Sequence, residues 1–270
     1  MELQIAAGLG AAALIYANVV EPRLPVLIRR TLHVPGLPDG WRGGRIALIS
    51  DLHAPMIASV RRWVPRALAG EYDFVAVPGD FAVRARHIPR AVETLLSLRS
   101  RLGVFATLGN IEYKRRGEAA KIAESLESSG VRLLNNSFVR LERNGDPVFL
   151  CGVDDPYTVR DDLAAAAPPV PGFRLLLAHA PQVFEREGIE SFDLVLCGHT
   201  HGGLVRLFGR PVFAHARMER RYSSGWVETP GKPPVFVSRG IGTGHPMARV
   251  FCRPAVYELT LERADEACCE

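Results

Sequence analysis

Seven residues of types that bind metal ions recur along this 270-residue chain, each at or near the end of a short apolar run. They comprise two aspartates, one asparagine and four histidines: Asp51, His53, Asp80, Asn110, His179, His199 and His201. Carboxylate oxygens and imidazole nitrogens together suit manganese, iron, zinc or nickel better than calcium or an iron–sulfur cluster. Seven ligands are too many for one ion and fit two. Two ions about 3.5–4 Å apart form the clamp used in phosphoester hydrolysis.

The most specific of these motifs is the stretch GHTHGG at residues 198–203. Two histidines on a glycine-rich turn are rarely structural. Taken singly, the Asp-x-His pair at 51–53 and the Gly-Asp pair at 79–80 are common in turns, and His179 alone fits a buried core histidine. The ordered combination of all five motifs therefore carries the prediction of a metal site.

Apolar runs of strand length precede these motifs, at residues 45–50, 74–77, 104–107, 173–178 and 194–197. Continuous apolar runs of this length are typical of buried strands. In an α/β sheet the carboxyl ends of the strands gather at one edge, where ligands bind. Candidate ligands that lie far apart in the sequence can therefore converge at that edge.

Helices are expected between these strands, so the pattern predicts an α/β fold. The apolar spacing predicts helices at 60–69, 88–97 and 118–128, with shorter ones at 161–167 and 182–187. Further short strands are predicted at 131–133, 138–142, 148–153, 212–214, 235–238 and 255–261.

Composition excludes several other classes of protein. Hydrophobic residues make up 47% of the chain and charged residues 23%, which is ordinary for a globular protein and argues against disorder. The net charge is only +4 and no basic stripe with interleaved aromatic residues is present, so nucleic-acid binding is disfavoured. The five cysteines form no CxxC pair, which argues against a disulfide framework and favours a reducing compartment.

The N-terminus carries an uncharged apolar run at residues 3–20. As a helix this run would span about 27 Å, just enough for the core of a bilayer. Arg23, Arg29 and Arg30 follow it, and positive residues flank the side that stays inside. We therefore expect a membrane-anchor helix over 1–21 with its N-terminus outside, followed by an irregular proline-containing linker over 22–43. A buried or peripheral hydrophobic helix is the alternative.

The motifs at 50–53, 79–80, 109–113, 178–179 and 198–203 together resemble the calcineurin-like metallophosphoesterase superfamily. The segment at 17–22 and the stretch at 237–254 are similar to its membrane-anchored YkuE-type bacterial branch, so the resemblance covers about residues 15–261. It implies a two-sheet metallophosphoesterase sandwich flanked by helices, with an N-terminal membrane-anchor helix. The metallophosphoesterase domain would span 44–262, before a polar tail at 263–270.

The resemblance also assigns roles to the seven candidate ligands. Asp51, His53 and His201 would hold the first ion, Asn110, His179 and His199 the second, and Asp80 would bridge the two. Asp80, Asn110 and His179 would thereby contribute to catalysis. The cofactors implied are two divalent metal ions; manganese is favoured, with iron, zinc, nickel or magnesium as alternatives.

One position departs from the family pattern. The residue after Asn110 is usually a histidine read as the general acid, and here it is Ile111, which cannot transfer a proton. Three explanations stay open: a leaving group that needs no acid, replacement by His245 or His215, or a slow or inactive enzyme. For substrate binding the candidates are Arg239, Arg249 and His245, because bidentate arginine suits phosphate.

The leading interpretation is a dinuclear-metal hydrolase that cleaves a phosphodiester or pyrophosphate bond through a metal-activated water. Its expected partners are a phosphorylated substrate and the membrane, with a nucleotide-linked lipid such as UDP-2,3-diacylglucosamine of lipid A synthesis as a candidate substrate. The expected location is the bacterial inner membrane, single-pass, with the catalytic domain facing the cytoplasm. The alternatives are a phosphodiesterase of broad specificity and a catalytically weak, metal-dependent protein that binds a phospholigand.

Overall fold

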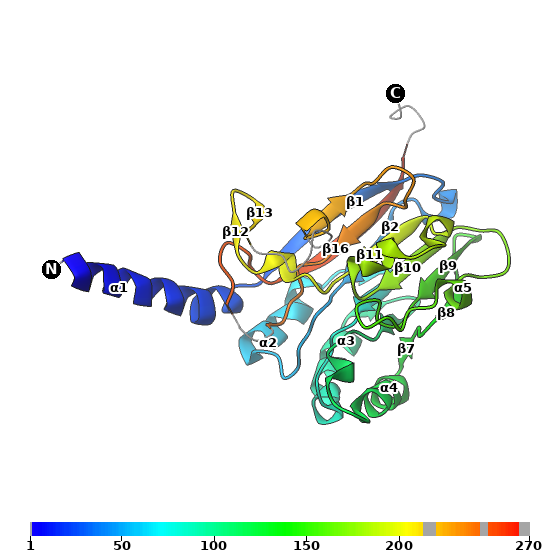
Figure 1. Ribbon diagram of the computed structural model, residues 1–270. Helices are drawn as coiled ribbons and strands as arrows, with labels where there is room; N and C mark the ends of the chain where they lie inside the picture. Colours follow the sequence, from blue (N-terminus) through cyan, green and yellow to red (C-terminus); the bar gives the residue numbers. More distant parts are fainter. Residues whose placement is uncertain (1, 213–219, 244–247, 265–270) are drawn as a thin grey trace.

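Two six-stranded sheets pack face to face in the computed structural model, which describes residues 2–212, 220–243 and 248–264 (Figure 1). The first sheet has the order β1 (Val26–Val34), β16 (Ala255–Arg263), β2 (Gly44–Leu48), β4 (Phe74–Pro78), β6 (Val104–Thr107) and β7 (Val131–Leu133). The second has the order β14 (Gly225–Val227), β15 (Val235–Val237), β11 (Leu194–Cys197), β10 (Arg174–Ala178), β9 (Asp146–Gly152) and β8 (Ser137–Arg143). The predicted two-sheet sandwich is confirmed.

Parallel pairing brings the carboxyl ends of the central strands to one edge of each sheet. In the first sheet β2, β4, β6 and β7 run parallel, and in the second β9, β10, β11 and β15 do. The outer pairs β2–β16, β8–β9 and β14–β15 are antiparallel. All five predicted strands that precede a candidate ligand therefore end on the sides where ligands are expected.

The main core lies between the two sheets. Phe74 and Phe105 from the first sheet and Leu175 and Phe236 from the second are each at most 2% exposed and belong to one apolar cluster. The rings of Phe74 and Phe105 meet edge to face with centroids 6.0 Å apart, a favoured aromatic geometry. This packing fixes the distance between the strand ends of the two sheets.

Helices cover the outer faces. On the first sheet lie α2 (Ala58–Ala67), α3 (Ile88–Leu96) and α4 (Glu118–Ser128), which bury Val64, Leu95 and Leu126 completely. On the second lie α5 (Leu163–Ala166) and the 3₁₀ segments η6 (Pro181–Glu185) and η7 (Ile189–Ser191). The α-helix predicted at 182–187 is thus a 3₁₀ helix that begins at a proline.

The remaining short elements lie at turns and edges. They are β3 (Glu71–Tyr72), β5 (Arg99–Ser100), β12 (Arg206–Leu207), β13 (Arg210–Pro211), η3 (Asp39–Trp41), η4 (Ala85–His87), η5 (Glu112–Lys114) and η8 (His201–Gly203). A strand was predicted at 212–214, but residues 213–214 lie outside the described residues. In the described part the antiparallel pair of strands β12 and β13 comes just before it.

The prediction of an irregular linker at 22–43 was wrong. β1 occupies Val26–Val34 and pairs in parallel with β16 over nine residue pairs at the edge of the first sheet. Leu32 and Val34 are at most 2% exposed between the sheets. Pro25 and Pro35 flank the strand instead of interrupting it, which is where an edge strand tolerates proline.

The apolar N-terminal run is helical but not uniform. It forms α1 (Glu2–Ile15), a five-residue π-helix η1 (Tyr16–Val20) and a 3₁₀ turn η2 (Glu21–Arg23). Figure 1 shows α1 projecting away from the two sheets. Among the described residues, no helix combines the length and the apolar character needed to cross a membrane.

Candidate metal centre

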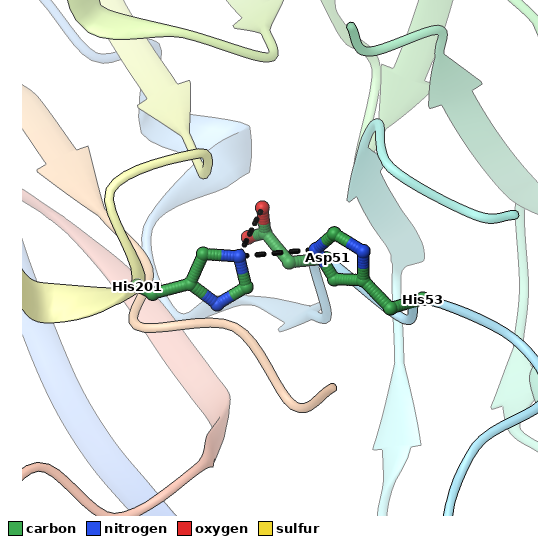
Figure 2. A group of neighbouring side chains, drawn as sticks. All are labelled: Asp51, His53 and His201. Atoms are coloured by element: carbon green, nitrogen blue, oxygen red, sulfur yellow. Dashed lines mark hydrogen bonds and ion pairs between the residues drawn. The ribbon is translucent and has the colours of Figure 1, made fainter. Parts of the chain in front are cut away.

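The first part of the site brings together Asp51, His53 and His201. Asp51 and His53 follow β2, and His201 opens η8 after β11. His53 Nε2 lies 3.0 Å from His201 Nε2, and His201 Nε2 lies 3.7 Å from Asp51 Oδ1. Figure 2 shows the ring of His201 approaching from one loop and the ring of His53 and the carboxylate of Asp51 from another. One candidate ligand atom of each residue lies within 4.8 Å of those of the other two.

Asp80 lies between this group and a second one. Its Oδ2 is 3.4 Å from His53 Nε2, and its Oδ1 is 3.2 Å from His179 Nε2. Asp51, Asp80 and His179 again place candidate ligand atoms within 4.8 Å of one another. One carboxylate therefore faces both halves of the site, which is the position that a bridging ligand needs.

Asn110 and His199 complete the second half. Asn110 Oδ1 lies 3.1 Å from both His179 Nε2 and His199 Nδ1, and these two ring nitrogens are themselves 3.1 Å apart. All seven candidate ligands thus form one connected group, which we call the seven-residue cluster.

The backbone of the cluster is strained at most of its residues. Five of the seven residues have a positive φ, although none is glycine: Asp51 (53°), His53 (46°), Asp80 (59°), His199 (70°) and His201 (49°). Each such residue costs on the order of 1–3 kcal/mol and persists only where the surroundings impose it. Concentrated strain of this kind is typical of a functional site.

Close packing around the cluster requires glycine at two neighbouring turns. A Cβ atom added at Gly79 would lie 2.7 Å from His179 Nδ1, and one at Gly109 would overlap the carboxylate of Asp80. Gly79 also has a φ of 75°, which other residues rarely adopt. The glycines of the Gly-Asp and Gly-Asn motifs therefore let the strand ends approach each other.

The charges of the cluster suit cations. Asp51 is fully buried, and although burial opposes its ionisation, the imidazoles of His201 and His179 hold its pKa below the usual value. Burial likewise disfavours the charged form of His179, but Asp80 and Asp51 outweigh it and raise its pKa to about 9. At His53 and His201, in contrast, burial outweighs the carboxylates and lowers the pKa, which favours the neutral imidazole that binds metal. Together with the N and O donor set, this fits two divalent ions.

Asp51 is held in place by groups from both sheets. Its carboxylate accepts hydrogen bonds from the hydroxyl of Ser50 and from the main-chain N–H of His199, the latter at 3.0 Å. The Ser50 hydroxyl also contacts that of Ser238, 2.7 Å away at the end of β15. The two sheets are therefore tied together directly at the cluster.

Sequence reasoning missed Glu112, which lies under the cluster. Its side chain is fully buried; Oε2 accepts from the main-chain N–H groups of Gly109 (2.7 Å) and Asp80 (3.3 Å), and Oε1 from that of Ala82 (3.0 Å). Burial and the neighbouring Asp80 raise the pKa of Glu112 to about 8. The available signal was an acidic residue in the same motif as Asn110.

The predicted substrate-binding residues are placed differently from one another. Arg249 is fully buried and donates to the carbonyl oxygens of Gly242 (2.8 Å) and Arg239 (3.0 Å), while its Nη2 lies 3.1 Å from His201 Nδ1. Because the guanidinium is enclosed by these partners, it positions His201 in this arrangement and does not face solvent.

The side chain of Arg239 is partly exposed, so phosphate binding there stays a prediction. His245 and the candidate acid His215 lie outside the described residues.

A pocket of about 440 Å³ opens beside the cluster, and His53 and Ile111 both line it. Its walls include the apolar side chains of Met56, Ile57, Val60, Val83 and Ile241. Basic side chains also line it: Arg84, His87, Lys114 and Arg115. Ile111 is 2% exposed, so the position of the usual general acid contributes an apolar wall instead.

A two-sheet sandwich with this cluster at its strand ends defines the class of metal-dependent phosphoester hydrolases. A sequence model of the calcineurin-like phosphoesterases matches residues 44–203, more than half of the chain, and the protein belongs to that family. The family prediction from the motifs is therefore confirmed.

Several bacterial relatives align along most of the chain. A metallophosphoesterase of Aquifex aeolicus is 31% identical over 245 residues, covering 86% of this chain and 90% of the relative. The phosphodiesterase YaeI of Escherichia coli is 29% identical over 265 residues, covering 91% and 92%. The metallophosphoesterase YkuE of Bacillus subtilis is 23% identical over 261 residues, covering 92% and 89%.

Proposed function

We propose that this phosphoester hydrolase cleaves a phosphodiester or pyrophosphate bond in an amphiphilic, membrane-associated substrate, with UDP-2,3-diacylglucosamine as the specific candidate. The observation that carries the proposal is the pocket beside His53, which joins apolar walls to basic side chains. An apolar wall suits a hydrocarbon group, and the basic side chains suit a second anionic group such as another phosphate. The name of YaeI, a phosphodiesterase, supports the type of bond.

The seven-residue cluster would hold the metal ions. We assign Asp51, His53 and His201 to one ion, Asn110, His179 and His199 to the other, and Asp80 to both, with manganese as the proposed metal. When bound, two such ions offset the charge of the phosphoryl group and lower the pKa of a water molecule. The seven side chains would hold the ions, and His53 also lines the pocket in which the substrate is proposed to bind.

The side chain of Ile111 limits the leaving groups that can be expelled. It offers no proton, and the loss of a general acid typically costs about 10²–10⁴-fold in rate. A phosphate or an activated phenol leaves as a stable anion and needs less help. This supports a pyrophosphate bond as the natural target over the ester of a simple alcohol.

Attachment to the membrane is part of the proposal. Leu9 and Leu14 on α1 are 68% and 66% exposed, and Arg23 is exposed at the end of the helical run. We propose that α1 anchors the protein to the bacterial inner membrane with the domain in the cytoplasm. Tethering would raise the effective concentration of an amphiphilic substrate.

The test is hydrolysis with added manganese, measured side by side on an activated aryl phosphodiester and on UDP-2,3-diacylglucosamine. Selective cleavage of the nucleotide lipid is expected. Cleavage of the aryl diester alone would contradict the lipid substrate and leave a phosphodiesterase of broad specificity. Bound metal with no turnover of either would favour the phospholigand-binding alternative, for which Ile111 is the supporting observation.

A further inference from the structure

Three segments that are distant in the sequence meet at the base of α1. The main-chain N–H of Arg249 donates to the carbonyl of Ala17 (2.9 Å), and that of Phe251 donates to the buried carboxylate of Glu21 (2.9 Å). Val205 and Val250 form a β-bridge next to these contacts. The end of the helical run, the segment before the β12–β13 turn and the segment at 249–252 are therefore tied together. Figure 1 shows the β12–β13 hairpin on the same side of the molecule as α1.

This junction exposes several large apolar side chains. Phe208, in the turn between β12 and β13, is 95% exposed, and Phe251 is 70% exposed. We call five of the exposed apolar residues of the three segments the junction face: Val19, Val20, Leu207, Phe208 and Phe251. Exposed apolar groups on segments that are joined in this way indicate an interaction surface, because their burial against a partner is favourable.

The charges next to the junction face are of one sign. Arg23, Arg210 and Arg253 are exposed within or beside the same three segments. Within 17–24, 205–212 and 249–253 the acidic residue is Glu21, which is fully buried and engaged with the N–H groups of Phe251 and Cys252. Aromatic and aliphatic groups combined with exposed arginine suit the interface of an anionic bilayer. Pairing of two copies through this face would bring arginines toward arginines.

We infer that the junction face docks onto an anionic lipid bilayer, with Phe208 and Phe251 entering the headgroup region. The contact is separate from anchoring by α1 and does not depend on hydrolysis. It also bears on the site, because Arg249 and Cys252 both contact His201, the Cys252 thiol at 3.2 Å from the His201 carbonyl oxygen. A docked junction face would hold this part of the cluster near the membrane surface.

The first test places a fluorescent probe at the tip of the hairpin in the full chain. The Phe208→Trp variant is mixed with phosphatidylglycerol–phosphatidylcholine vesicles whose acyl chains carry bromine, and quenching of tryptophan is compared with the wild type. Extra quenching is expected. Val170→Trp, at a 47% exposed site in the loop between α5 and β10, should add none. Phe208→Trp protein that sediments with the vesicles without extra quenching would overturn the inference.

A second variant distinguishes docking on a bilayer from pairing of two copies of the chain. It also shows whether docking is independent of catalysis. Phe208→Asp should weaken sedimentation with anionic vesicles by about tenfold relative to Val170→Asp, because an apolar contact is replaced by a charge. Its hydrolysis of a soluble aryl phosphodiester should be unchanged. Equal vesicle binding by the two variants, together with no extra quenching in Phe208→Trp, would contradict docking, since α1 alone would then account for the binding. A dimer in vesicle-free buffer that Phe208→Asp dissociates would instead show that a second copy covers the face.

Discussion

The carboxylate of Glu112 supports the seven-residue cluster without belonging to it. It accepts hydrogen bonds from the N–H groups of Gly109, Asp80 and Ala82 and so joins the turns after β4 and β6. In Glu112→Gln one oxygen becomes an NH₂ group that faces an N–H donor. We expect the free energy of unfolding to fall by about 1–3 kcal/mol, as for a buried polar group left unsatisfied.

Denaturant unfolding measures this change, and Glu124→Gln is the control because Glu124 is exposed on α4. Equal stability of Glu112→Gln and Glu124→Gln would contradict the supporting role. Metal affinity, measured on the same variants, should fall for Glu112→Gln alone, since both Asp80 and Asn110 lie on the turns it holds.

The substitution Ile111→His tests whether the lack of a general acid limits turnover. In Ile111→His an imidazole would enter the pocket wall beside His53. Turnover of substrates with poor leaving groups should rise, by up to about 10²–10⁴-fold, more than turnover of activated ones. Steady-state rates on an alkyl and a nitrophenyl phosphodiester make the comparison. A similar change on both would argue against this explanation.

The residues most accessible to sequence reasoning were those whose types bind metal directly. The structure brings all seven candidate ligands together, although their assignment to ions stays a proposal. Glu112 and Arg249 were harder to interpret because they act through main-chain groups and through His201, and those contacts arise only when distant strands assemble. Arg249 was predicted to bind phosphate because arginine suits that group, but its side chain is fully buried.

At the scale of elements, β1 is the strand that the sequence pattern did not predict. The prolines around it suggested a linker, yet the residues between Pro25 and Pro35 alternate enough to bury Leu32 and Val34. The strand needs β16, about 230 residues away, as its partner. The central strands were predicted well because both of their faces are buried, so each reads as a continuous apolar run. An edge strand carries a weaker pattern.

Leu32→Ala tests whether β1 is part of the core. Leu32 is 2% exposed between the sheets, so the substitution should reduce the free energy of unfolding by about 2–5 kcal/mol. Arg30→Ala, on the same strand but exposed, should change it by less than about 0.5 kcal/mol. Urea unfolding followed by circular dichroism compares them. If residues 22–43 were a linker, neither substitution would change the free energy of unfolding.

At the scale of the whole molecule, the cluster joins the two halves of the sandwich. Asp51, Asp80 and Asn110 follow strands of the first sheet, whereas His179 and His199 follow strands of the second. Five strained residues and two buried carboxylates therefore lie where the sheets meet. An ion bound there would contact both sheets, so metal binding should be linked to the stability of the whole fold.

Removal of metal should consequently lower the melting temperature of the entire domain. An ion that binds only the folded chain adds about 2.7 kcal/mol at 100 times its dissociation constant, and for a chain of this size this corresponds to a shift on the order of 5–10 °C. Calorimetry before and after chelation, together with elemental analysis expected to find two ions per chain, makes the measurement. Asp80→Ala should bind fewer ions and respond less to chelation. Asp162→Ala, which removes the N-cap of α5, should bind as many ions as the wild type and show the same shift on chelation. A melting temperature that chelation leaves unchanged in a protein shown to have carried metal would mean that the ions do not hold the sheets together.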